Sequence, residues 1–281
     1  MIFHDQRTLN QHLTPFRTAG DSIGLVPTMG ALHSGHTSLI DSALKDNVLI
    51  VVSIFVNPTQ FNKAEDLKKY PRTMEADQAL LAAYGDRVCV YAPNVEDLYG
   101  DNVAARSFDF GGIEIAMEGA FRPGHFDGVG TVVSLLFQAV NPNKAYFGEK
   151  DFQQLQIIRK MVELDALDVE VVGCPIARSE KGLALSSRNK RLNQDQLDHA
   201  LLIYRCLIAA QQNFEKQSIL ILQDQARTLF ATQDELDLEY FIIADAKTLQ
   251  PATKKQEKSQ YRAFVAAHID GVRLIDNMAL N

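Results

Sequence analysis

The sequence predicts an α/β protein whose N-terminal part forms a parallel sheet and whose C-terminal part forms a smaller α+β domain. Up to about residue 176, short β-branched apolar runs alternate with segments in which apolar residues recur at helical spacing. Such alternation is typical of parallel strands joined by covering helices. After Pro175 the pattern changes to helical stretches followed by β-like runs. We therefore expect a Rossmann-like domain with covering helices over 1–176 and a smaller domain over 177–281.

The N-terminal part supplies the strands of the expected sheet in order. The apolar run 23–26 precedes a glycine-bearing turn and a helix, and the nearly continuous apolar run 48–56 is typical of a central strand covered on both faces. The segment 131–140 is ambiguous, but its length and the following Asn141-Pro142 favour a helix over a strand. Further elements are expected in chain order as strands over 87–92, 144–148 and 169–173, and a helix over 151–164.

The C-terminal part has a simpler pattern and carries little motif evidence of its own. The charged segment Lys254–Lys258 separates two of its β-like runs and is expected to be a solvated turn. The predicted elements are helices near 194–212 and 219–231, and strands over 238–243, 261–267 and 272–275.

Composition limits the classes of function. The net charge of −7 argues against a general nucleic-acid-binding protein, so any anion site must be a local arrangement. Cys89, Cys174 and Cys206 lie far apart without Cys-x-x-Cys spacing, which favours reduced core thiols over a structural zinc site. The N-terminus has no signal-peptide pattern, and no apolar run reaches transmembrane length. The expected location is therefore the cytoplasm, with no membrane partner.

The segment Pro27–His36 carries the most informative pattern in the chain. It joins the strand at 23–26 to a helix, and a helix start presents unpaired backbone N–H groups to anions. Its glycines allow close approach of a phosphate, to which His33 and His36 can donate hydrogen bonds. Metal binding by the two histidines is an alternative, although no nearby Cys or carboxylate completes a ligand set. The segment predicts a site for nucleotide phosphates.

Two carboxamides, Asn57 and Gln60, follow the most buried predicted strand. As neutral donors and acceptors at the ligand edge of a parallel sheet, they suit a substrate with hydroxyl and carboxylate groups. The alternative is that either residue caps the next turn. The loop Arg122–Gly128 also contains a cation and a histidine, and there a structural role is favoured over a substrate contact.

Two further polar segments suit a triphosphate. In Tyr146–Gln154 a strand and a glycine again precede a helix, with Lys150 as a point cation and Gln154 one turn further along the helix face. In Leu185–Asn189, two serine hydroxyls stand beside a guanidinium. The alternatives are an acidic N-cap followed by a surface lysine in the first segment and a polar linker in the second.

Taken together, these segments resemble the pantothenate synthetase (pantoate–β-alanine ligase) family. The family order and spacing are kept across about two thirds of the chain. Two residues, Lys181 and Ala177, depart from the family pattern. They bear on the affinity for adenine and leave the residues expected to bind phosphate intact. The matching stretches are Pro27–His36, Ser53–Phe61, Tyr70–Thr73, Arg122–Val129, Phe147–Gln154 and Gly182–Asn189.

The resemblance implies that (R)-pantoate attacks ATP to give pantoyl adenylate and pyrophosphate, and that β-alanine then displaces AMP. It also implies Mg²⁺ travelling with ATP, for which Asp77 is a weak candidate contact, and a homodimer. Because an acyl adenylate hydrolyses readily, we expect the C-terminal domain to act as a lid. Rival interpretations are another nucleotidyltransferase of this fold and a non-catalytic nucleotide-sensing module.

The same resemblance assigns residues to each ligand. His36 is the expected proton-donating residue, and His33 and Lys150 complete the expected catalytic set. Pantoate contacts are expected from Asn57, Gln60 and Gln154, with Gln60 also near β-alanine. The expected ATP contacts are Met29, Gly30, Ala31, Leu32, His33, Ser34, Gly35, His36, Gly148, Glu149, Lys150, Asp151, Ala177, Leu185, Ser186, Ser187 and Arg188.

Overall fold

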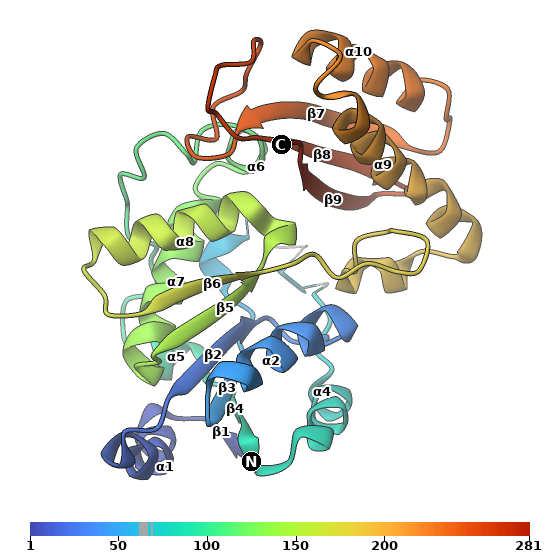
Figure 1. Ribbon diagram of the computed structural model, residues 1–281. Helices are drawn as coiled ribbons and strands as arrows, with labels where there is room; N and C mark the ends of the chain where they lie inside the picture. The colour runs from blue at the N-terminus through green and yellow to red at the C-terminus, as the bar shows by residue number, and fades with distance from the viewer. Residues whose placement is uncertain (62–66, 69) are drawn as a thin grey trace. The chain divides into compact units, whose positions relative to one another are not determined.

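The computed structural model describes residues 1–61, 67–68 and 70–281, and these residues form two compact units (Figure 1). The N-terminal unit comprises Met1–Phe110, Arg122–Glu149 and Gln154–Pro175. The C-terminal unit comprises Ile176–Asn281 together with two segments from earlier in the chain, Gly111–Phe121 and Lys150–Gln153. The chain therefore passes between the units several times, whereas the sequence analysis expects a single division at 176/177.

The N-terminal unit is built on a parallel sheet, as predicted. Within the described residues it has six strands in the order β1-β4-β3-β2-β5-β6, and every neighbouring pair is parallel. The central strands are buried because helices cover both faces. The strands are β1 (Ile2–Phe3), β2 (Ile23–Thr28), β3 (Leu49–Ile54), β4 (Val88–Tyr91), β5 (Lys144–Gly148) and β6 (Glu170–Cys174).

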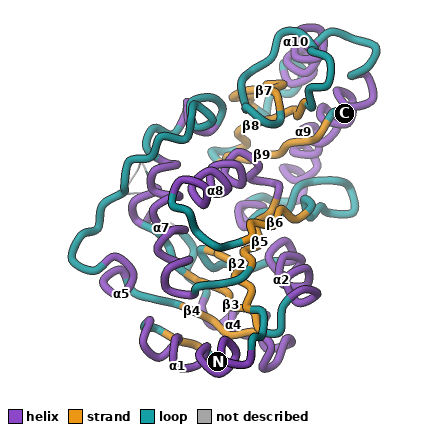
Figure 2. Tube along the Cα trace, turned by 60° about the vertical axis from the view of Figure 1, so that its left-hand side comes forward, coloured by secondary structure: helices purple, strands orange, loops and turns teal. Residues whose placement is uncertain are grey.

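Helices lie on both faces of this sheet (Figures 1 and 2). On one face, Leu39 and Ile40 of α2 pack into a cluster with Val26 and Ile50 of the sheet. On the other face lies α7, which also contacts α1. The ambiguous segment 131–140 belongs to α7, so the helix prediction is confirmed. The helices of this part are α1 (Gln6–Ala19), α2 (Ser34–Asp46), α4 (Met74–Leu81), α5 (Val95–Tyr99), α7 (His125–Val140) and α8 (Phe152–Leu164), with 3₁₀ turns η1 (Pro58–Gln60), η2 (Ala82–Arg87) and η3 (Glu149–Asp151).

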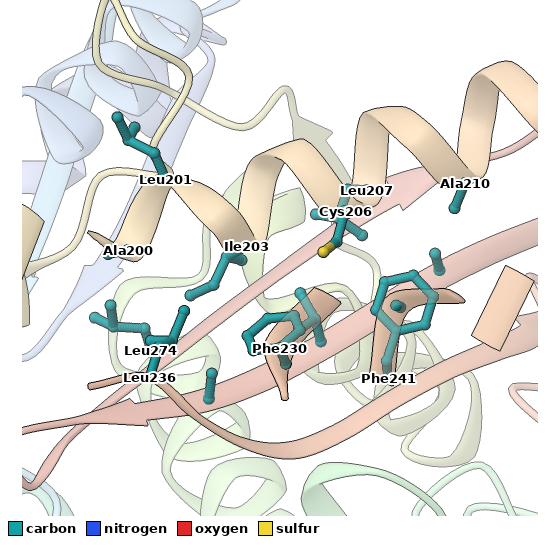
Figure 3. Close-up of a cluster of buried hydrophobic side chains, with 14 of the residues drawn as sticks. Ala200, Leu201, Ile203, Cys206, Leu207, Ala210, Phe230, Leu236, Phe241 and Leu274 are labelled. Atoms are coloured by element: carbon teal, nitrogen blue, oxygen red, sulfur yellow. The ribbon is translucent and has the colours of Figure 1, made fainter. Parts of the chain in front are cut away.

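The C-terminal unit packs helices on an antiparallel sheet, which in the described part of the chain has three strands in the order β7-β8-β9. Figure 3 shows Ile203 and Leu207 of α9 facing Phe230 and Phe241 in its core. This agrees with the predicted α+β domain. Its elements are α6 (Glu118–Phe121), η4 (Ser187–Arg191), α9 (Gln194–Asn213), α10 (Ile219–Phe230), β7 (Asp237–Asp245), β8 (Tyr261–Ile269) and β9 (Val272–Ala279).

The thiols Cys89, Cys174 and Cys206 are free and buried. Burial raises the pKa of Cys89 to about 12 and that of Cys206 to about 11, and it also raises the pKa of Cys174. Because the thiolate is the reactive form, we expect the folded protein to resist iodoacetamide at mildly alkaline pH. Intact-mass measurement should show alkylation of all three thiols only after unfolding in urea. Equal labelling rates in folded and unfolded protein would contradict the assignment of these thiols to the core.

Candidate functional site

The carboxyl ends of β2, β3 and β5 lie side by side at one edge of the N-terminal sheet. They do so because β2 pairs in parallel with both β3 and β5. The strand order also reverses at β2, since β3 and β4 follow on one side and β5 and β6 on the other. Ligands of open α/β sheets bind at such a switch point, outside the carboxyl ends of the strands. The segments after β2 and β5, which the sequence analysis assigns to phosphate, begin there.

The turn after β2 has an unusual backbone. Gly30 and Ala31 both lie in the left-handed region, with φ of 80° and 52°. A Cβ at Gly30 would stand 3.1 Å from an Asp77 carboxylate oxygen, so glycine is needed for conformation and for space. The buried Asp77 carboxylate accepts hydrogen bonds from the backbone N–H of Ala31 at 3.0 Å and of Leu32 at 2.8 Å. Asp77 therefore stabilises the turn, and the suggested Mg²⁺ contact at this residue stays a prediction.

Replacing Asp77 tests its role in this turn. Asp77→Ala removes the acceptor that two buried backbone N–H groups share, and the loss of such an acceptor costs about 1–3 kcal/mol for each group. We expect the free energy of unfolding, measured in urea, to fall by about 2–5 kcal/mol. Asp77→Asn keeps one acceptor and should lose less. The control is Glu75→Ala, on the exposed side of the same helix, for which a change within about 0.5 kcal/mol is expected. Equal stability of Asp77→Ala and Glu75→Ala would contradict this role.

His33 and His36 cap the start of α2. Nδ1 of His33 accepts from the N–H of Gly35 at 3.1 Å, and Nδ1 of His36 accepts from the N–H of His33 at 3.3 Å. A neutral imidazole that accepts at Nδ1 carries its proton on Nε2. The rings are 4.2 Å apart between centroids. The capping interaction thus fixes a tautomer in which each Nε2 can donate to an anion at the helix start.

Asn57 and Gln60 lie beside this turn, after β3. Gln60 is 9% exposed, and its Nε2 contacts the sulfur of Met29 at 3.1 Å. Asn57 donates to the Gln60 side chain and to the Gly128 carbonyl, each at 3.1 Å, and accepts from Tyr99 at 2.6 Å. The Asn57 amide therefore orients Gln60, in line with the capping alternative. Its contact with pantoate, like that of Gln60, stays a prediction.

The first turn of α7 also supports Gln60. The ring of His125 is buried, and its Nδ1 lies 3.0 Å from the Gln60 carbonyl oxygen. Gly128 permits close approach of the backbones, because a Cβ there would lie 2.5 Å from the Thr59 carbonyl oxygen. These contacts favour a structural role for the segment Arg122–Gly128, although residues 125–128 form the start of α7 and are not part of a loop as expected.

In the C-terminal unit, Lys150, Ser186 and Arg188 line one pocket, together with Asn189 and Asp276. Two of the segments that the sequence analysis assigns to phosphate therefore contribute to one pocket of this unit. Ser186 caps η4 by accepting from the N–H of Arg188 at 3.2 Å. The Lys150 side chain is 16% exposed, and its Nζ lies 3.8 Å from the Asp151 carboxylate.

Ala177, whose identity bears on adenine affinity, lies in a short hairpin that ends next to Ser186 of this pocket. The N–H of Leu185 donates to the Ala177 carbonyl at 2.9 Å, and Arg178 and Ala184 form a β-bridge. Lys181, at the hairpin end, pairs with Asp198 at the surface at 2.7 Å. This residue therefore makes its ion pair away from the residues that line the pocket.

The other expected contacts lie in both units, and their roles stay predictions. Gln154 lies on α8 and is partly exposed. The remaining expected ATP contacts lie at the starts of α2 and η4 or around η3, namely Ser34, Gly35, Ser187, Gly148, Glu149 and Asp151.

Comparisons with known proteins identify the family. The family model described as pantoate-beta-alanine ligase matches residues 1–279. The chain belongs to the pantoate-beta-alanine ligase family. Curated relatives named pantothenate synthetase include that of Christiangramia forsetii, 51% identical over 280 residues, covering 100% of this chain and 99% of the relative. That of Bacteroides fragilis is 46% identical over 283 residues, covering 99% of this chain and 98% of the relative.

Solved structures of this family have the same fold. The pantothenate synthetase of Thermus thermophilus superposes with a TM-score of 0.90 at 39% identity, covering 99% of both chains. The pantoate-beta-alanine ligase of Francisella tularensis, described as a complex with beta-gamma ATP and beta-alanine, has a TM-score of 0.81 at 35% identity. That match covers 100% of this chain and 97% of the other.

Proposed function

We propose that this protein condenses (R)-pantoate with β-alanine at the expense of ATP, in two steps. First, a carboxylate oxygen of pantoate attacks the α-phosphorus of ATP, and the bond to pyrophosphate breaks. Second, the amine of β-alanine attacks the acyl carbon of pantoyl adenylate, AMP leaves, and the amine loses a proton as the amide forms. The observation that carries this proposal is the match of the pantoate-beta-alanine ligase family model to residues 1–279. The lining of one pocket by Lys150, Ser186 and Arg188 agrees with it.

The residues supply what the first step needs. A carboxylate is a poor nucleophile towards a polyanion, so the reactants must be held in line and phosphate charge must be stabilised. We assign the Nε2–H groups of His33 and His36 to ATP phosphates, with His36 as the transition-state donor. Lys150, the serine hydroxyls and Arg188 are assigned to the pyrophosphate, which gains charge as it leaves.

Gln60 and Gln154 are assigned to pantoate, and Asn57 to holding Gln60 in place. Gln60 suits this role because its carboxamide is fixed by Asn57 and Met29 at the sheet edge. The Gln60 side chain is also assigned to β-alanine, whose carboxylate its amide can bind.

Mg²⁺ is proposed as part of the MgATP substrate. The Asp77 carboxylate is engaged by backbone N–H groups, and the Asp276 carboxylate by Arg178. We assign the ion mainly to the ATP phosphates, as is usual for Mg²⁺ with nucleotides.

The proposed setting is a cytoplasmic homodimer whose C-terminal unit acts as a lid. Free, buried thiols fit a reducing compartment. In the described part of the chain, no helix combines the length and apolarity needed to cross a membrane. The homodimer rests on the family resemblance, and sedimentation equilibrium would test it.

An isotope-exchange assay tests the proposed activity. Exchange between pyrophosphate and ATP should require pantoate and no β-alanine, and AMP formation should require both. Exchange that is independent of pantoate would favour another nucleotidyltransferase. ATP binding without exchange or AMP formation would favour a sensing module.

A further inference from the structure

β9 contains a buried polar pair that the mechanism above does not use. Asp276 is 3% exposed and Asn277 is 2% exposed. Burying a carboxylate and a carboxamide costs free energy unless both are well paired. The hydrogen-bond partners of the two side chains indicate their role. Asn277 contacts one of the segments that we assign to phosphate, and Asp276 contacts the hairpin before the other.

Asn277 holds the backbone of Lys150. Its Nδ2 donates to the Lys150 carbonyl oxygen at 2.8 Å, and its Oδ1 accepts from the guanidinium of Arg262. That guanidinium lies 3.9 Å from the centre of the Phe152 ring. Because the donor and acceptor ends of a carboxamide are distinct, rotating this amide would break both hydrogen bonds. Asn277 thereby fixes the chain on both sides of Asp151.

Asp276 holds the second segment through Arg178. The guanidinium donates to both carboxylate oxygens, at 2.6 and 2.9 Å, and also to the Gly182 carbonyl at 3.0 Å. It lies 4.7 Å from the centre of the Tyr204 ring. Gly182 has φ of +99°, and a Cβ there would lie 2.1 Å from that ring. The hairpin that leads directly into Ser186 is thus held against β9.

We propose that Asp276 and Asn277 are positioning residues for adenylation. Asp276 acts on the Ser186–Arg188 loop through Arg178, and Asn277 acts directly on the backbone of Lys150. Consecutive Cα atoms are a fixed distance of about 3.8 Å apart. The pair therefore sets the spacing of the phosphate donors before ATP binds, which is the preorganisation that electrostatic catalysis requires. This inference rests on the proposed function.

Asn277→Ala should affect one half-reaction selectively. We expect pantoate-dependent pyrophosphate exchange to slow on the order of 10- to 100-fold, since small misplacements of catalytic groups cost such factors. Reaction of supplied pantoyl adenylate with β-alanine should be nearly unchanged, because pyrophosphate has already left. General structural damage would slow both steps. Arg178→Lys, which keeps the charge but loses the bidentate fork, should show the same selectivity.

A matched control and a double mutant complete the test. Asn213→Ala also deletes an amide that donates to a backbone carbonyl at 2.8 Å in this unit, and both half-reactions should remain normal. In a Lys150→Ala background, Asn277→Ala should add little, because its effect passes through Lys150. If Asn277→Ala fails to fold, Asn277→Asp keeps the acceptor for Arg262 and loses the donor to Lys150.

The outcomes separate the two proposals. If Asn277→Ala slowed both half-reactions equally, the positioning role would be overturned. The same holds if Asn277→Ala slowed exchange by the same factor in the unmodified protein and in the Lys150→Ala background. Normal exchange in a folded Asn277 variant would overturn it as well. Absence of pantoate-dependent exchange in the unmodified protein would instead overturn the proposed function.

Discussion

Replacing Lys150 with alanine is expected to slow pantoate-dependent pyrophosphate exchange by about 10²–10³-fold, the usual effect of removing one preorganised donor to a developing anion. The ammonium group lies in the pocket that Ser186 and Arg188 also line. Its ion pair with the exposed Asp151 carboxylate is long, at 3.8 Å, and the buried Asp276 carboxylate in the same pocket keeps its two hydrogen bonds from Arg178 when the ammonium is removed. The loss should therefore appear in the rate and not in the stability.

The control for this variant is Lys160→Ala, on α8. Lys160 pairs with Glu163 on the helix surface at 3.0 Å and should tolerate alanine with normal exchange. Lys150→Arg keeps a cation but changes its geometry, and an intermediate rate is expected. Normal turnover by Lys150→Ala would remove this residue from the site.

The fold was predictable where local patterns are strong. β3 is buried along almost its whole length, so its apolar run has no competing interpretation. The end of α7 was marked by Asn141, which takes the left-handed conformation that stops the helix. By contrast, α1 was not predicted. Only Leu9 and Leu13 of this helix are buried, and Pro15 lies inside it.

The membership of the segment Gly111–Phe121 in the C-terminal unit was also not predicted. Glu118 in this segment pairs with Arg273 through two hydrogen bonds of 2.8 and 2.7 Å, and it accepts another from Tyr240 at 2.8 Å. These partners lie far away in the sequence. An ion pair of this kind leaves no periodic signal, so it becomes visible only once the chain has folded.

In the candidate site, too, local patterns were visible in the sequence and contacts between distant residues were not. The segments proposed to bind phosphate stand out in the sequence because their chemistry is local, with a glycine turn, histidines or hydroxyls in one short run. The contacts that hold them were not predicted, because Asp77 acts on the distant Ala31 and Asn277 on the distant Lys150. One signal was present: Asp276 and Asn277 directly follow the apolar residues Leu274 and Ile275. Polar residues inside a buried strand indicate a structural or functional contact.

Two substitutions at His36 should separate helix capping from the contact with phosphate. In the structure, Nδ1 accepts from the His33 N–H, so the donor to an anion is Nε2. His36→Asn places a carboxamide oxygen near the position of Nδ1 and provides no group at Nε2. We expect its free energy of unfolding to change by no more than about 1 kcal/mol, while pantoate-dependent exchange slows on the order of 10²-fold.

His36→Gln reverses the comparison, because its longer side chain can place an amide N–H near the position of Nε2. It should therefore retain more exchange activity than His36→Asn, even where it caps the helix less well. His199→Asn is the matched control: His199 pairs with Glu235 at the surface at 2.6 Å, and its replacement should leave exchange unchanged. Normal exchange by a stable His36→Asn variant would exclude Nε2 from the reaction. Equal loss of rate in both variants, accompanied by equal loss of stability, would assign His36 to capping alone.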